Sequence, residues 1–100
     1  MHKYLPLSTI KRFIPIMEAT GVSKVARSNQ GFLTAYQEAR GRSENLDAYW
    51  QQRREALIAR HEAQRLQQGE PLFAYGLPTR RHLALIAWAY SPSAAQLARY

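Results

Sequence analysis

Apolar residues recur along most of this chain at the three- and four-residue spacing of an amphipathic helix. The first such stretch places four apolar side chains on one face: Ile10, Phe13, Ile14 and Met17. Ser8 is a candidate N-cap, but Pro15 lies inside the stretch, and a proline there removes a hydrogen bond and crowds the preceding turn. We therefore expect two short helices that meet near Ile14, the second ending at Gly21.

Three further helices are predicted in the middle of the chain. A short helix over residues 23–28 precedes a turn at 29–31, and the next helix runs from Phe32 to Arg40. A long helix follows, capped by Ser43 or Asn45 and stopped by Gly69. Its expected inner face consists of Leu46, Tyr49, Trp50, Leu57, Ile58 and His61. Its other faces, which include Arg54, carry the mixed charge that is typical of a solvent-exposed surface.

The last third of the chain contains an unbroken apolar run, residues 83–90, which predicts a helix over 79–90. Because this helix is apolar on all sides, we expect it to be the central element. Residues 70–78 form a connection with two prolines and one glycine, and a final short helix follows Ser93. No strand alternation persists anywhere. The predicted fold is therefore all-α, a single compact bundle of five to six helices around the helix 79–90, in one domain over residues 1–100.

The composition fits a protein with its own core. The chain has 100 residues, of which 46% are hydrophobic, and it has no cysteine, which excludes disulfides and cysteine-based zinc sites. No apolar run approaches the roughly 20 residues that span a bilayer. The N-terminal segment also lacks the long apolar centre of a signal peptide. We expect a cytoplasmic protein that does not enter a membrane.

The net charge is +7, and the excess lies at the two ends of the chain. Residues 1–17 and residues 71–100 each carry +3 and contain no acidic residue, whereas residues 18–70 hold eight basic and seven acidic residues. Eleven of the 14 basic residues are arginine, whose planar fork can bind phosphate through two hydrogen bonds. A GC-rich genome would also raise the arginine content. The excess of arginine over lysine therefore has two explanations, phosphate binding and genome composition.

Two arginines fall in the first turn of the predicted helix 79–90. Thr79 is the candidate cap, and Arg80, Arg81 and His82 follow it. The helix macrodipole already places positive partial charge at this end, so further cations there predict a bound anion. The alternative is ion pairing with carboxylates of the long helix or its end, namely Glu55, Glu62 and Glu70.

The segment Gly21–Arg40 resembles the helix-turn-helix of bacterial DNA-binding proteins. In this resemblance Ala26 packs across a glycine turn, and residues 32–40 are the recognition helix. The glycine follows Ala26 by five residues, where the common pattern has four. The resemblance implies base contacts by Gln37, which suits adenine, and by Arg40, which suits guanine. The alternative is an ordinary helical hairpin. Residues 21–36 and 78–92 are also similar to stretches of small bacterial and phage helical proteins, which implies no particular function.

Catalytic and metal-binding patterns are missing from the sequence. The three histidines, His2, His61 and His82, have no ligand-like spacing, and Arg65 stands where a paired-histidine zinc motif would have its second histidine. There is no phosphate-binding glycine loop and no nucleophile elbow. We expect no enzyme activity, no metal and no cofactor.

These patterns predict a small basic protein that binds nucleic acid, with DNA favoured over RNA, mainly through its phosphates. The candidate contact residues are Thr79, Arg80, Arg81, His82, Lys24, Arg27, Lys11, Arg12, Gln37 and Arg40. A homodimer would suit this function, since two-fold symmetric proteins bind paired half-sites. The alternative function is a protein-interaction module, or a phage-type modulator, that engages an acidic partner surface.

Overall fold

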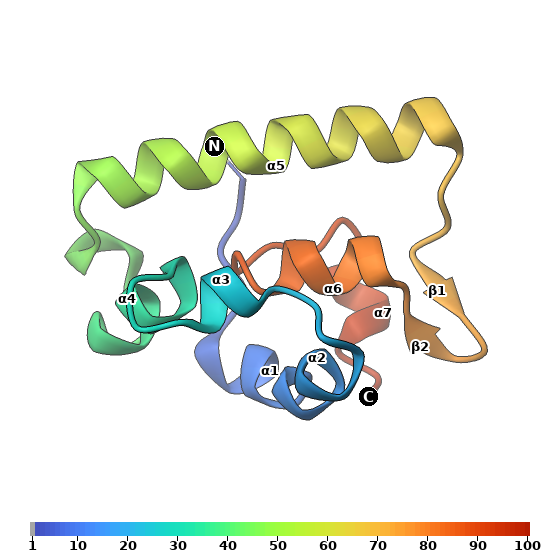
Figure 1. Ribbon diagram of the computed structural model, residues 1–100, viewed down its shortest axis with the longest axis horizontal. Helices are drawn as coiled ribbons and strands as arrows, with labels where there is room; N and C mark the ends of the chain where they lie inside the picture. The colour runs from blue at the N-terminus through green and yellow to red at the C-terminus, as the bar shows by residue number, and fades with distance from the viewer. Residues whose placement is uncertain (1) are drawn as a thin grey trace.

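The computed structural model describes residues 2–100, and most of them are helical (Figure 1). The elements follow in the order α1 (Leu7–Lys11), α2 (Ile14–Thr20), α3 (Lys24–Arg27), α4 (Phe32–Glu38), the 3-10 turn η1 (Ser43–Asn45), α5 (Ala48–Gln68), β1 (Phe73–Ala74), β2 (Leu77–Pro78), α6 (Arg80–Ile86) and α7 (Ala94–Leu97). The helical prediction is confirmed in outline, but the purely all-α fold is wrong, because two short strands interrupt the chain before α6.

The two strands form a tight antiparallel hairpin in which Phe73 is paired with Pro78 and Ala74 with Leu77. Tyr75 and Gly76 make the turn, with φ angles of 54° and 78°. Two successive residues with positive φ are the mark of a type I′ turn, whose twist matches that of the strands it joins. Each strand has only two residues, too few to show an alternating pattern in the sequence.

The break between α1 and α2 is where the proline predicts it. The helix α1 ends at Lys11, α2 begins at Ile14, and Pro15 occupies the first turn of α2, where its missing N–H leaves no hydrogen bond unmade. Gly21 closes α2 with a φ of 71°. Ser8 is not a cap, however, because α1 already begins at Leu7, after Pro6.

The corner between α3 and α4 depends on Gly31. A Cβ atom at this position would lie 2.0 Å from the carbonyl oxygen of Val25 and 2.3 Å from that of Ala26. The two short helices therefore approach more closely than any residue with a side chain allows. Ala26 is buried at this corner as predicted, whereas Val25 is exposed to solvent.

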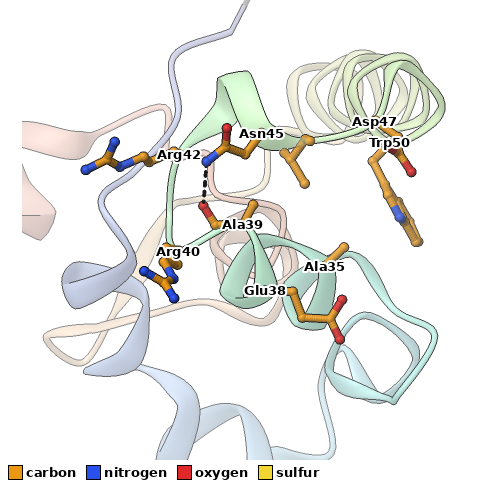
Figure 2. A pocket seen from close by; sticks show the side chains of 9 residues that line it. Ala35, Glu38, Ala39, Arg40, Arg42, Asn45, Asp47 and Trp50 are labelled. Atoms are coloured by element: carbon orange, nitrogen blue, oxygen red, sulfur yellow. Dashed lines mark hydrogen bonds between the residues drawn. The ribbon is translucent and has the colours of Figure 1, made fainter.

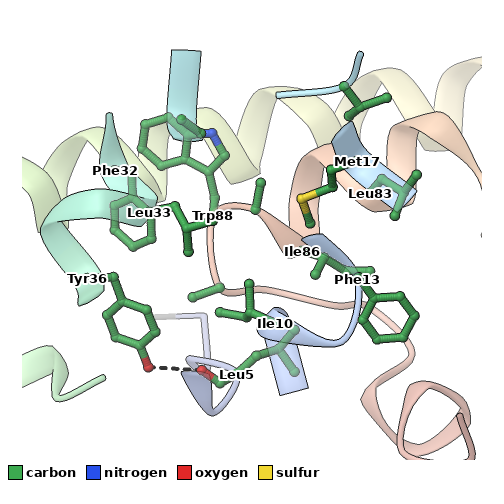
Figure 3. Close-up of a cluster of buried hydrophobic side chains, with 14 of the residues drawn as sticks. Leu5, Ile10, Phe13, Met17, Phe32, Leu33, Tyr36, Leu83, Ile86 and Trp88 are labelled. Carbon is green, nitrogen blue, oxygen red and sulfur yellow. Dashed lines mark hydrogen bonds between the residues drawn. The ribbon is translucent and has the colours of Figure 1, made fainter. Parts of the chain in front are cut away.

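The main core surrounds α6, which lies between α5 on one side and α1 and α2 on the other (Figure 1). Figure 3 shows its aromatic side, where the Tyr36 hydroxyl donates a hydrogen bond of 2.9 Å to the Leu5 carbonyl oxygen. The helix is shorter than the predicted 79–90. It ends at Ile86, and Ala89 adopts a left-handed φ of 59°, a position where glycine usually signals a helix end.

The long helix α5 packs differently from its predicted pattern. Its fully buried residues are Ile58 and Arg54, whereas Tyr49, predicted to face inward, is exposed. The assignment of Arg54 to the solvent-exposed surface is therefore wrong. The cap predictions at Ser43 and Asn45 are also wrong, because both residues belong to the 3-10 turn that precedes α5. Gly69 ends the helix as expected, with a φ of 64°.

Candidate nucleic-acid interface

The start of α6 is held by contacts within the protein. Thr79 is the N-cap, and its side chain accepts a hydrogen bond from the backbone N–H of His82 at 3.4 Å. The same hydroxyl donates to the Pro71 carbonyl oxygen at 2.8 Å. Because α6 has only seven residues and its cap is occupied, its first turn offers an anion no preformed backbone site.

Arg81 is paired with a carboxylate. Its guanidinium group forms a two-pronged contact with Glu70, at 2.8 Å and 3.2 Å, and also donates to the Gln64 side chain at 2.8 Å. The hydrogen bond to Glu70 raises the pKa of Arg81, and the same bond lowers the pKa of Glu70. Of the two readings of the first-turn arginines, internal ion pairing is therefore the correct one for Arg81.

His82 is fully buried and has both ring nitrogens bonded. Nδ1 lies 2.9 Å from the Leu72 carbonyl oxygen, which can only accept, so Nδ1 carries the proton. Nε2 then accepts from the Ser91 hydroxyl at 2.6 Å. Burial is the main cause that lowers the pKa of His82. The prediction that His82 contacts an anion is wrong, because the ring is neutral in this arrangement and solvent does not reach it.

Three other predicted cations meet at the end of α2. The sequence alone does not show that these residues lie together. Arg27 directs its guanidinium group at the Val22 carbonyl oxygen, with distances of 2.9 Å and 3.2 Å. Arg80 donates to the Thr20 carbonyl oxygen at 2.9 Å. Lys24 is exposed, and its side chain passes beside Gly21 in the same turn. We call Lys24, Arg27 and Arg80 the α2-end cluster.

The opposite end of α2 carries a second group of cations. Arg12 donates to the Leu97 carbonyl oxygen at 3.0 Å and to the backbone oxygen of Tyr100. The ring of Phe13 contacts the ring of Tyr100 at a centroid distance of 5.7 Å. These contacts bring the acid-free first and last segments of the chain together. We call the exposed residues Lys11, Arg12 and Arg99 the chain-end cluster.

The two residues that the helix-turn-helix resemblance assigns to base contacts lie on different surfaces. Gln37 is exposed on α4 and lines a hollow with Glu18 and Arg27. Arg40 follows the end of α4 with a φ of 58° and lines a groove between α4 and the start of α5 (Figure 2). The structure therefore does not bring Gln37 and Arg40 together on one helix face.

The groove in Figure 2 mixes both signs of charge. It encloses about 660 Å³. Its polar lining residues are Glu38, Arg40, Arg42, Asn45 and Asp47, and the indole of Trp50 forms part of one side. The two carboxylates and two arginines largely offset each other, so this groove lacks the positive field that a polyanion requires.

Sequence reasoning missed Arg54, the most buried charge in the described residues. Its guanidinium group donates to four backbone carbonyls, those of His2 and Lys3 and those of Trp88 and Ala89, at 2.7–3.0 Å. It also lies 3.6 Å from the centroid of the Tyr4 ring. Arg54 thus holds the N-terminal segment and the end of α6 against α5. The helical spacing could have found it, because Arg54 lies four residues after Trp50 and four before Ile58, on the predicted inner face.

Within residues 2–100, no helix combines the length and apolar character that a membrane crossing requires. The same residues contain no group of three or more histidine, aspartate or glutamate side chains arranged to hold a metal ion.

The chain was compared with protein families, with curated proteins and with solved structures. None of the three comparisons yields a match, so the candidate interface rests on the geometry described above.

Proposed function

We propose that this protein binds nucleic acid through the α2-end cluster and the chain-end cluster, mainly by contacts with phosphates. The helix α2 has seven residues, so the two clusters lie about 10 Å apart along its axis. Five of the six side chains are exposed, and the sixth, Arg27, is half-buried. The clusters can therefore contact neighbouring phosphates of one strand.

The proposal rests mainly on the hydrogen-bond partners of the arginines in these clusters. Arg27 and Arg80 bond to neutral carbonyl oxygens near a helix end, and within residues 2–100 neither forms an ion pair. A helix C-terminus supplies only about half a negative charge, so most of the positive charge of the guanidinium groups remains. Arg81, in contrast, is neutralised by Glu70. The excess charge of the chain is thus concentrated around α2.

The helix-turn-helix resemblance contributes less to this proposal. A recognition helix usually presents several side chains to the major groove. The helix α4 has only seven residues and buries Phe32, Leu33 and Tyr36. Gln37 remains a candidate for one base contact, and Glu38 on the same helix would repel phosphate. We therefore propose binding with weak sequence preference, in which phosphates supply most of the affinity.

The proposal is tested by fluorescence anisotropy with labelled duplex DNA, single-stranded DNA and RNA over a range of salt concentrations. If all six cations contact phosphates, the expected slope of log K against log salt is about −4 to −5, since each contact contributes about −0.7 to −0.9. Absence of binding to all three nucleic acids at low salt would overturn the proposal. Retention of a protein partner after nuclease treatment, without nucleic-acid binding, would favour the protein-interaction alternative.

Two neighbouring arginines provide a matched pair for this measurement. The substitution Arg80→Ala should make the slope shallower by about 1 and lower the affinity. Arg81→Ala should leave the slope unchanged, because Glu70 already neutralises Arg81. Glu18 on α2 is exposed and has no ion-pair partner in the part of the chain that the structure describes, so Glu18→Gln should raise the affinity. Equal effects of Arg80→Ala and Arg81→Ala would contradict the assignment of the α2-end cluster.

A further inference from the structure

The tip of the β1–β2 hairpin presents an aromatic ring entirely to solvent. Tyr75 is fully exposed, although large aromatic side chains are usually at least partly buried. It occupies the first central position of the type I′ turn with a φ of 54°. This position favours asparagine, aspartate or glycine, and other residues are strained there. Strained residues of this kind concentrate at functional sites.

The hairpin beneath this ring is fixed to the body of the protein. Phe73 stacks on Tyr100 with a centroid distance of 5.8 Å and an interplanar angle of 6°, and it contacts the edge of His82 at 5.0 Å. The Tyr100 hydroxyl donates to the Gly76 carbonyl oxygen in the turn. The hairpin projects from the end of the molecule (Figure 1). Tyr75 is therefore carried outward by a supported element, which lowers the cost of using it as a contact.

Two arginines lie near the base of the hairpin. Phe73, Tyr100 and Arg99 line a shallow hollow of about 290 Å³ together with Gln96. Residues 71–100 contain no acidic side chain, and Arg12 contacts the backbone oxygen of Tyr100. Exposed aromatic rings beside arginines are the usual combination for binding single-stranded nucleic acid.

We propose that the hairpin binds an unpaired base of single-stranded nucleic acid, with the Tyr75 ring stacked on the base and Arg99 in contact with the adjoining phosphate. This inference rests on the proposed function and narrows its ligand to unpaired strands. In a duplex both faces of a base are covered by its neighbours, so a ring at a hairpin tip has no base face to contact without unstacking the helix.

The test exploits the strain at this position. Tyr75→Asn places a favoured type I′ residue in the turn and removes the ring. We expect the melting temperature to stay equal or rise. The affinity for a fluorescent oligothymidine should fall about 5- to 150-fold, the range that corresponds to the loss of one stacked base. Tyr75→Phe, which keeps the ring, should bind oligothymidine within about threefold of the parent.

Tyr49 is the matched control, since it is another exposed tyrosine and lies on α5 beside Arg53. Tyr49→Ala should leave oligothymidine affinity unchanged, and Tyr75→Asn should leave duplex affinity unchanged. If Tyr75→Asn binds oligothymidine as the parent does, the hairpin proposal is overturned, while salt-dependent binding through the cation clusters still stands. If the parent binds no nucleic acid at low salt, both proposals fall together.

Discussion

Arg54 places a full positive charge in the interior and satisfies it mainly with backbone carbonyls. Glu55 is the nearest carboxylate, 3.7 Å from the guanidinium group. Burial lowers the pKa of Arg54 from its very high usual value, yet arginine stays protonated in proteins. A buried charge of this kind is tolerated only when its donors are all satisfied. The carbonyl oxygen of Ala89 also accepts from the Leu5 N–H at 2.7 Å, so the other three carbonyl oxygens depend more on the arginine.

We predict that Arg54→Ala lowers the free energy of unfolding by roughly 3–5 kcal/mol, because it removes four hydrogen bonds together with a fully buried side chain and leaves the buried Trp88 carbonyl without its donor. The neighbouring Arg53 is exposed, and Arg53→Ala should change stability by about 0.5 kcal/mol or less. Urea denaturation followed by circular dichroism measures both values. A loss below about 1 kcal/mol for Arg54→Ala would show that water or relaxation replaces these hydrogen bonds.

The buried His82 makes stability depend on pH. Its pKa in the folded protein is lowered, chiefly by burial, so below the unfolded value of about 6.5 the unfolded chain binds more protons. The stability that His82 contributes is therefore present above pH of about 6.5 and is lost as the pH falls toward the folded pKa. His61 acts in the same direction, since burial lowers its pKa as well.

We predict that the free energy of unfolding falls as the pH is lowered from about 7 to about 5. Each of these histidines contributes at most about 1.4 kcal/mol per pH unit to this fall. The lowered pKa values of Glu55 and Glu70 act only at lower pH. An NMR titration of the His82 ring checks the cause directly. A His82 pKa at or above 6.5, or constant stability over this range, would contradict the prediction.

At the scale of elements, the corner between α3 and α4 leaves no space for a side chain at Gly31. The φ of Gly31 is −92°, so the requirement for glycine comes from the close approach of the two helices and not from an unusual backbone angle. Gly69 differs in both respects, because it has a φ of 64° and open space around it.

We predict that Gly31→Ala destabilises the protein by roughly 3 kcal/mol or more, since the new methyl group overlaps the backbone of α3. Gly69→Ala should cost only about 1 kcal/mol, the strain of a left-handed alanine. Thermal unfolding of the two variants compares these effects. A similar loss in both variants would mean that the α3–α4 corner relaxes around the added methyl group.

Several elements were predictable from the sequence because their boundaries depend on local backbone chemistry. Pro15 separates α1 from α2, and Gly21 and Gly69 end α2 and α5. The end of α6 was not predictable in this way. Ala89 adopts the left-handed angle there, and its backbone N–H and carbonyl bond to Ile86 and Leu5. Tertiary contacts thus replace the usual glycine signal.

At the scale of the whole molecule, the net charge can be read from the sequence, but which basic residues are paired with carboxylates cannot. The identity of the cations was predictable, and so was the set of carboxylates available to Arg81. Which arginine is paired depends on how the end of α5 meets the start of α6, and this places Arg81 against Glu70 while Arg80 turns toward α2. The partners of Arg54 lie likewise in segments more than 30 residues away, although its helical spacing with Trp50 and Ile58 already places it on the inner face.

These long-range contacts of Arg54 have a consequence for the order of folding. They join positions separated by 34 to 52 residues, so large loops must close before they form. We therefore expect α5 to dock late. Arg54→Lys should accelerate unfolding and change the refolding rate little. The rings of Trp50 and Trp88 lie 6.1 Å apart across this junction, so stopped-flow tryptophan fluorescence would follow the docking step directly. Refolding slowed as much as unfolding is accelerated would place α5 in the folding nucleus instead.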